Sequence, residues 1–394
     1  MNSTHFTMPR LQAWLSTGLF AFIMAGCGGG VDSGGTGGSP TYASGPITGS
    51  GSIIVNGVRF DDTSAAVSND DGGGRSKDEL KLGMIVEVRG SAISTDSAGD
   101  KSSTASSIAF NSELVGKIDS LDSVTPHASM VVFGQTVAIT STTVFDDSLM
   151  GGSSALAPGN VVEVYALFDA TSGTYTATRV ERKSSIPSEF RLRGKVSAFD
   201  AGAKAFNIGT ERISYASVTD APAGLADGSI VRVRVNSAGG NHAWTATRAR
   251  DGSSRPDDGS HARVEGLISQ FTSASQFTVG TVQVTTSGST VVTGAPALGV
   301  RVEVEGTMGG TALAASSVSV EADSGQTENR FVGTISLFNS GAKTFVVKGQ
   351  TISYAGSIEY QGGNESNLRD GANVDVRATL VNGNTFQATR ISFK

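Results

Sequence analysis

The sequence predicts an all-β protein made of five small, five-stranded β-barrels in tandem, with small β-sandwiches as the alternative fold for each unit. Three features predict it: a nine-residue pattern that recurs along the chain, a Gly-rich composition, and strand-turn-strand signals in the repeats. The 394 residues include 51 Gly, and 17% of them are charged. Such a composition is typical of short strands joined by many turns.

The recurring pattern is Leu-x-x-Gly-x-x-Val-x-Val, and its near-constant spacing indicates an array of one structural unit. Four copies are complete, and in a fifth copy Pro296 replaces the Leu. The glycines of the five copies, which lie 69 to 76 residues apart, are Gly83, Gly159, Gly228, Gly299 and Gly371.

Each copy of the pattern predicts a turn followed by a strand. In the first copy Val86 and Val88 flank Glu87, and the other copies alternate Val with a charged residue in the same way. Alternation with a period of two predicts a half-buried strand, with the valines inward and the charged residues outward. The Gly suits a tight turn with a positive φ, and the Leu is expected to anchor that turn on the core.

Each unit is expected to form a closed, OB-like barrel, because it holds five short strands and leaves little room for a helix. In the first unit, Asn56-Gly57 between two apolar runs predicts a hairpin, and Ser76 three residues before Glu79 predicts a capped helical turn. Such small barrels bury little core, so neighbours are expected to support one another. The shortest junction, between the first and second units, is expected to be the stiffest. The expected repeats are 45–110, 113–182, 190–250, 262–321 and 330–394.

The N-terminus predicts export. The longest apolar stretch, Leu11–Ala25, follows Arg10, as in a secretory signal. Met24-Ala25-Gly26-Cys27 resembles the lipobox of bacterial lipoproteins, in which the Cys becomes the lipid-modified first residue. Cys27 is the only cysteine of the chain. Lipidation explains this count better than a chance cysteine beside an ordinary cleavage site.

We therefore expect a signal peptide over 1–26, a lipid anchor on Cys27 and a Gly- and Ser-rich tether over 27–44. Gly28 follows the Cys in place of an Asp, which by resemblance to lipoprotein sorting favours the outer membrane. No other apolar run approaches the ~20 residues needed to span a bilayer. The formal net charge of −6 argues against a nucleic-acid partner.

Parts of the first unit carry a family resemblance. Ser52–Asp61, Leu82–Gly90 and the recurring Thr-Ala-Thr-Arg resemble a bacterial family of unknown function, a small β-barrel repeated in tandem in proteobacterial envelope lipoproteins. Ser50 departs from the aromatic residue expected before Gly51-Ser52. The family has no assigned activity, so the resemblance implies fold and envelope location only.

The residues that carry chemistry give no candidate active site. The histidines lack the spacing of metal ligands, and we expect them in solvent-exposed turns. Gly-x-Ser-x-Gly elbows are missing from the sequence. We therefore expect no enzyme activity, no metal and no cofactor. The histidines are His5, His127, His242 and His261.

Pairs of adjacent aspartates are the next candidates, because calcium prefers carboxylate and carbonyl oxygens. The pairs lie at strand ends or in linkers, without the spacing of a known calcium loop. We interpret them as solvated turn caps, with calcium binding as the alternative. The pairs are Asp61-Asp62, Asp70-Asp71, Asp146-Asp147 and Asp257-Asp258.

Alignment of the repeats gives three further columns. Trp244 shares a position with Tyr175, Leu313 and Phe386, which predicts core packing and not a ligand platform. A second core column contains Phe206, Phe277 and Phe345. A third column contains Arg179, Arg248 and Arg390, interpreted as a solvated strand face, with contact to an anionic glycan or lipid headgroup as the alternative.

These observations predict a lipid-anchored protein of the cell envelope that acts as a non-enzymatic spacer or protein-interaction module. Five barrels in line would reach at most ~140 Å. The alternative is a lipoprotein that binds polysaccharide or another ligand, with the polar loops 68–77 and 94–104 as the first candidate site. An enzyme is the least favoured class.

Overall fold

Five closed β-barrels follow one another along the chain, and the predicted fold class is confirmed. The computed structural model describes residues 38–69, 73–321, 328–382 and 384–394. The predicted signal peptide, Cys27 and most of the tether lie outside the described residues. Within the described part, no helix combines the length and the apolar character needed to cross a membrane.

The bounds of the elements are these. The first barrel contains β1 (Thr41–Ser50), β2 (Ile53–Val55), β3 (Val58–Asp61), β4 (Ala66–Ser68), η1 (Lys77–Glu79), β5 (Ile85–Gly90), β6 (Ser94–Thr95) and β7 (Lys101–Phe110). The second contains β8 (Leu114–Leu121), β9 (Ser129–Val132), β10 (Gln135–Ala138), β11 (Val144–Phe145), η2 (Asp147–Leu149), η3 (Gly152–Ala155), β12 (Val161–Asp169) and β13 (Thr174–Arg182). The third contains β14 (Glu189–Asp200), β15 (Ala205–Ile208), β16 (Glu211–Ser214), β17 (Ile230–Asn236) and β18 (Ala243–Asp251). The fourth contains β19 (His261–Ser273), β20 (Gln276–Val279), β21 (Val282–Thr285), β22 (Val291–Thr293), β23 (Arg301–Gly309) and β24 (Ala312–Val320). The fifth contains β25 (Glu328–Thr334), β26 (Ser336–Asn339), β27 (Thr344–Val347), β28 (Gln350–Ser353), β29 (Glu359–Gln361), η4 (Glu365–Asn367), β30 (Asn373–Asn382) and β31 (Thr385–Phe393).

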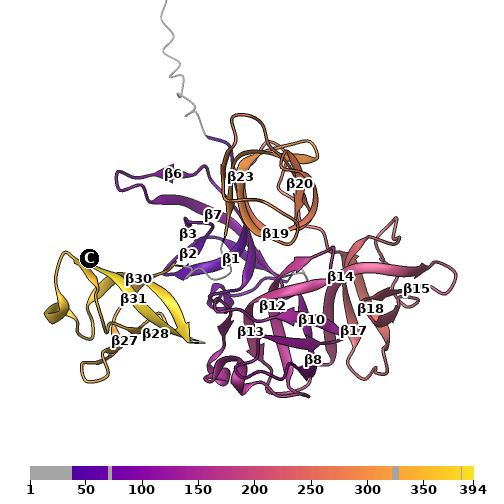
Figure 1. Cartoon of the computed structure of the whole chain (residues 1–394), viewed down its shortest axis with the longest axis horizontal. Coiled ribbons are helices and arrows are strands. Elements are labelled where there is room, and N and C mark those ends of the chain that lie inside the picture. Colours follow the sequence, from indigo (N-terminus) through magenta and orange to yellow (C-terminus); the bar gives the residue numbers. More distant parts are fainter. Residues whose placement is uncertain (1–37, 70–72, 322–327, 383) are drawn as a thin grey trace, which may run out of the picture. The chain divides into compact units, whose positions relative to one another are not determined.

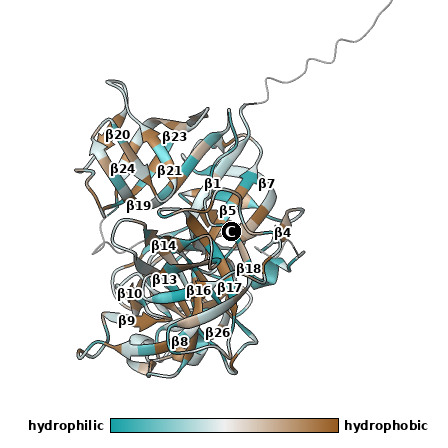
Figure 2. Ribbon diagram, turned by 90° about the vertical axis from the view of Figure 1, so that its right-hand side faces the viewer, coloured by the Kyte–Doolittle hydropathy of each residue, from teal (hydrophilic) through white to brown (hydrophobic). Residues whose placement is uncertain are grey.

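The barrels share one strand order, which the fourth barrel illustrates. β19, β20 and β21 form an antiparallel meander, and β21 pairs in parallel with β24. β24 then pairs with β23, and β23 returns to β19, which closes the ring. Figure 1 shows β19, β20 and β23 curled around this ring. In Figure 2, apolar and polar segments alternate along its strands, as a barrel with a filled interior requires.

The recurring pattern forms the turn and strand that the sequence predicts. Its five glycines have φ values between 76° and 92°, in the left-handed region that favours Gly. The following valines point inward, and Val86 and Val88 are at most 1% exposed. The Asn56-Gly57 hairpin is also confirmed, as is the capping box of Ser76 and Glu79 at η1.

Strand pairing extends from one barrel to the next. β1 pairs in parallel with β19 through residues 41–44 and with β25 through residues 49–50. β8 pairs with β14, so the second and third barrels also share a sheet. The expected in-line arrangement is therefore wrong, because the first barrel contacts the fourth and fifth directly.

The tether also ends earlier than expected. Residues 41–44 were assigned to it because of the Gly- and Ser-rich composition, but they begin β1. Tyr42 is 1% exposed and packs with the core residues of the fourth barrel, while Ala43 packs in the core of the first. This contact between segments more than 200 residues apart carries no local sequence signal.

A candidate site where four barrels meet

In the structure, the predicted site residues mainly cap turns and form contacts between barrels. Each described histidine faces a carboxylate: Asp122 for His127, Glu211 for His242 and Glu305 for His261. The expectation of solvent exposure fits His242, whose side chain is 69% exposed. It is wrong for His127, whose side chain is 15% exposed. Among the described residues, no group of three or more His, Cys, Asp or Glu is placed to hold a metal.

The described aspartate pairs cap turns or bind neighbouring segments. Asp61 accepts hydrogen bonds from the backbone and side chain of Thr63, and these bonds lower the pKa of the Asp61 carboxyl. Asp146 caps the N-terminus of η2. Asp257 forms an ion pair of 2.7 Å with Arg89 of the first barrel. Asp70 and Asp71 lie outside the described residues.

The aromatic column is core in three of its four positions. Tyr175, Leu313 and Phe386 are at most 1% exposed, whereas Trp244 is only partly buried. The Trp244 ring packs edge-on against Phe133 of the second barrel at 4.5 Å, and its indole N–H donates to Glu211. A cavity of about 400 Å³ lies beside these rings. Trp244 therefore belongs to the contact between the second and third barrels.

The interpretation of Arg179 as a solvated residue is wrong. Arg179 is 7% exposed, because the first barrel covers this part of β13. Its guanidinium donates to the carbonyl of Leu82 at 3.1 Å and to Glu181 at 2.7 Å. Arg390, at the same repeat position, is partly buried and donates to Glu359 at 2.8 Å.

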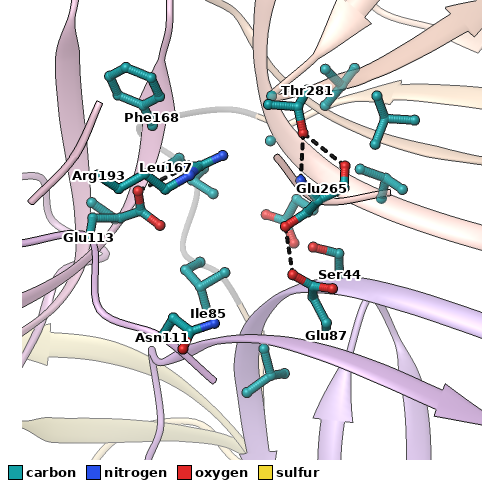
Figure 3. Close-up of a pocket in the computed structure, with 18 of the residues that line it drawn as sticks. Ser44, Ile85, Glu87, Asn111, Glu113, Leu167, Phe168, Arg193, Glu265 and Thr281 are labelled. Carbon is teal, nitrogen blue, oxygen red and sulfur yellow. Dashed lines mark hydrogen bonds and ion pairs between the residues drawn. The ribbon is translucent and has the colours of Figure 1, made fainter. Parts of the chain in front are cut away.

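A small cavity of about 80 Å³ lies where the first four barrels meet, and Figure 3 shows its lining. On one side, Ser254 of the linker between the third and fourth barrels donates to Glu87 on β5 at 2.6 Å. The same Ser254 exchanges two hydrogen bonds with the hydroxyl of Thr281. The linker is thus attached to the first and the fourth barrel at once.

On the other side of this cavity, one buried carboxylate holds two guanidinium groups. Glu113 is 3% exposed and accepts from Arg193 on β14 at 3.0 Å and from Arg232 on β17 at 3.1 Å. Figure 3 shows the Glu113 carboxylate turned toward Arg193. Burial lowers the pKa of Arg193, but the charge and the hydrogen bond of Glu113, together with the nearby Tyr175 and Glu87, more than offset this effect, so the pKa is raised and the guanidinium stays charged. The Arg193 guanidinium also lies 5.6 Å from the ring centre of Phe168.

Arg193 and Arg232 belong to a larger group on the outer face of the third barrel, which we call the arginine array. Strand register places Arg193 opposite Arg232 and Arg191 opposite Arg234. It also places Arg232 opposite Arg250 and Arg234 opposite Arg248. The array therefore has two rows of three arginines across β14, β17 and β18. Its six members are Arg191, Arg193, Arg232, Arg234, Arg248 and Arg250.

A second cavity, of about 210 Å³, lies against the array and adjoins the first. The cavity is lined by Arg232, Arg234, Arg248 and Arg250, together with Glu87, Asn111, Asp251 at the end of β18 and the linker residues 252–254. Gly252 allows the linker to lie close to β17, because a Cβ there would come within 2.8 Å of the Val231 carbonyl carbon. Guanidinium groups around a small cavity are suited to binding an oxyanion.

Sequence reasoning missed the array, although a signal for it was present. The residue between the two valines of the recurring pattern is acidic in four repeats and is Arg232 in the third. The acidic residues at this position are Glu87, Glu163, Glu303 and Asp375. The array thus replaces the usual acidic residue of the repeat with a basic one.

Comparison with known families matches residues 44–97, 115–181, 265–319 and 332–392 to a domain of unknown function, DUF5666. These four segments cover more than half of the chain. The chain belongs to the DUF5666 family. The matched segments fall in the first, second, fourth and fifth barrels. The third barrel, which carries the arginine array, lies outside the segments matched to DUF5666.

Two other comparisons add little. No match was found among curated proteins. Among solved structures, the one titled "drosophila Unr CSD456" is 14% identical, with 54% of this chain and 98% of that chain covered. Its TM-score is 0.14, so this likeness carries no argument.

Proposed function

We propose that this DUF5666 protein is a lipoprotein of the bacterial outer membrane whose barrels form one non-enzymatic scaffold for partner proteins. The observation that carries the scaffold proposal is the double pairing of β1, with β19 on one half and with β25 on the other. A strand shared by three barrels holds them in fixed positions, whereas a spacer of independent units would be connected by linkers alone.

Ion pairs between barrels support the same proposal. Asp100, in the β6–β7 loop of the first barrel, binds Arg330 of the fifth at 2.9 Å and Arg377 at 3.5 Å. Lys101 beside it reaches Glu305 of the fourth barrel at 3.5 Å. The charged groups of this loop therefore connect the first barrel to the fourth and the fifth. This arrangement argues against loop 94–104 as an open ligand site, the place that the alternative ligand-binding function would give it.

The envelope location rests on the resemblance of the segment around Cys27 to a lipobox. The test is metabolic labelling of cells with an alkyne analogue of palmitate, followed by membrane fractionation. We expect label on the wild-type chain in the outer-membrane fraction, and no label on the Cys27→Ser variant. A wild-type chain without label would remove the lipid anchor from the proposal.

The scaffold role is tested with a photoreactive amino acid at exposed apolar positions on three barrels. Met150, Val291 and Leu337 are 80%, 65% and 76% exposed. We expect discrete crosslinks to envelope proteins from at least two of these positions in living cells. The control is the same amino acid at the buried Leu313, which should give none. Crosslinks no stronger than this control at all three positions would contradict the scaffold proposal.

Ligand binding is the second candidate function, and the arginine array favours it. A ligand role does not need the loops of the first barrel, because the array and its cavity lie on the third. Ligand binding at the array does not depend on the scaffold proposal.

A further inference from the structure

We propose that the cavity beside the arginine array is a binding site for a phosphate monoester group, carried by a soluble phosphate compound or by a lipid headgroup. The array itself is costly for the sheet that carries it. Like charges directly opposite one another in an antiparallel ladder destabilise the sheet. The third barrel has two such pairs between β17 and β18, Arg232 with Arg250 and Arg234 with Arg248. An anion between the rows would relieve this repulsion.

The side chains that line the cavity carry more positive than negative charge. Four arginines and two carboxylates, Glu87 and Asp251, line it, which leaves two positive charges in excess among the lining side chains. Both carboxylates accept hydrogen bonds nearby, Glu87 from the Ser254 hydroxyl at 2.6 Å and Asp251 from the Ser253 amide at 2.9 Å. A phosphate monoester carries about 1.5 to 2 negative charges at neutral pH and is therefore attracted to this lining, although Glu113, Asp220 and Glu189 outside it already pair with three of the arginines.

Carboxylates outside the lining of the cavity pair with arginines of the array. Glu113 neutralises two arginines at once, because it binds both Arg193 and Arg232. Asp220 lies 3.5 Å from Arg250, and the two side chains are 62% and 46% exposed. Glu189 lies 3.6 Å from Arg234. The Asp220–Arg250 pair is exposed, and exposed ion pairs contribute little to stability, so an entering anion can compete with Asp220 at low cost.

The geometry also suits a phosphate group in size and donors. The cavity of about 210 Å³ is smaller than the usual site of a drug-sized ligand. The cavity therefore fits a phosphate group and part of the compound that carries it. Each guanidinium presents a planar fork of N–H donors that matches two oxygens of a phosphate. Asn111 and the Ser253 and Ser254 side chains lie in the same lining.

The test uses the full chain, purified in detergent, and isothermal titration calorimetry in 150 mM salt. The probes are inorganic phosphate and glucose 1-phosphate, and a flotation assay adds phosphatidylcholine vesicles with or without phosphatidic acid. We expect one equivalent of phosphate compound to bind the wild type. The double variant Arg248→Gln/Arg250→Gln should bind at least tenfold more weakly. Arg390→Gln, at the same repeat position in the fifth barrel, should bind like the wild type.

The arms of the experiment separate the two sources of the group. Binding to the soluble probes that the double variant loses supports a soluble ligand. Flotation only with phosphatidic acid vesicles, again lost in the double variant, supports a lipid headgroup. The proposal is overturned if no probe binds the wild type, or if the double variant binds as well as the wild type.

Misfolding of the double variant is separated from loss of the site by its melting temperature. Arg248 and Arg250 lie opposite Arg234 and Arg232, so their replacement by Gln relieves repulsion between the strands. The double variant without phosphate should therefore melt no lower than the wild type. Arg250→Lys provides a second check, because it keeps the charge but loses the planar fork. We expect its affinity to lie between those of the wild type and the double variant. An Arg250→Lys affinity equal to that of the wild type would overturn the assignment of the Arg250 guanidinium as a phosphate ligand.

Discussion

The side-chain amide of Asn56 donates to the carbonyl of Arg263, and the guanidinium of Arg263 donates to the carbonyl of Asn56, both at 3.0 Å. The two residues lie 207 positions apart and belong to the first and fourth barrels. Asn56 also holds the hairpin turn, with a φ of 50°, and is 3% exposed. One residue therefore fixes a local turn and joins two barrels.

Replacement of Asn56 by Gly should weaken the contact between these barrels while the turn is kept, because Gly also adopts a positive φ. The change removes hydrogen bonds to the carbonyls of Ser44 and Arg263 in a buried place. We expect the free energy of unfolding in urea to fall by about 1–3 kcal/mol. Asn241→Gly is the matched control, since Asn241 has a φ of 53° but is exposed. Equal effects of the two changes would show that the amide bonds contribute nothing.

The glycines of the recurring pattern allow a second matched comparison. Gly83 and Gly228 have φ values of 80° and 92°. A Cβ on Gly83 would come within 2.5 Å of the Thr178 carbonyl oxygen of the second barrel, whereas a Cβ on Gly228 meets nothing within 4 Å. We expect Gly228→Ala to cost about 1–2 kcal/mol of unfolding free energy from its backbone alone. Gly83→Ala should cost clearly more, and a smaller loss for Gly83→Ala would contradict the close contact of the first two barrels.

Glu113 gives a third prediction, because its carboxylate is the counter-ion of two arginines in the array. Glu113→Gln keeps the shape of the side chain but leaves Arg193 and Arg232 without that charge. Removal of one partner from a buried pair usually costs about 3–5 kcal/mol, and we expect a loss of this size in urea unfolding. Glu359→Gln is the control, because the Glu359 side chain is 53% exposed and pairs with Arg390. That control should lose far less stability than Glu113→Gln, because exposed ion pairs contribute little.

The sequence predicts features that depend on neighbouring residues and misses those that depend on distant ones. The turn at Gly83 and the inward Val86 and Val88 follow from a short pattern, and they are confirmed. The predicted tether wrongly includes residues 41–44 of β1, because the partner strand β19 lies more than 200 residues away.

The arginine array was missed for a related reason. Alignment of the repeats compares equivalent positions on one strand, so it detected the column that contains Arg248. It does not say which residues of neighbouring strands stand side by side, and the pairing of Arg234 with Arg248 follows only from register. In the same way, the burial of Arg179 depends on contact with the first barrel, which no pattern on β13 reveals.

A fourth prediction concerns the acid stability of the fourth barrel. Glu305 accepts a hydrogen bond from His261 and lies beside the guanidinium of Arg263, and these contacts lower its pKa from 4.5 to about 2. A carboxyl with a lowered pKa in the folded state stabilises the protein above its unfolded pKa, and this contribution is lost as the pH falls through the folded pKa. The Glu305→Gln variant should therefore be less stable than the wild type at pH 7. Because Glu305 is partly exposed, we expect a difference of about 1 kcal/mol that disappears between pH 4.5 and 2.

Glu303, two residues away on β23, provides a control of opposite sign. Burial raises its pKa, and the nearby Arg263 offsets this only in part. A raised carboxyl pKa means that stability is lost as the pH rises past the unfolded value. The Glu303→Gln variant should therefore gain stability relative to the wild type as the pH rises above 4.5. Glu305→Gln should instead lose stability relative to the wild type as the pH rises from 2 to 4.5. Urea unfolding of the three proteins from pH 2 to 7 measures both slopes. Slopes of the same sign would contradict the different environments of these two carboxylates.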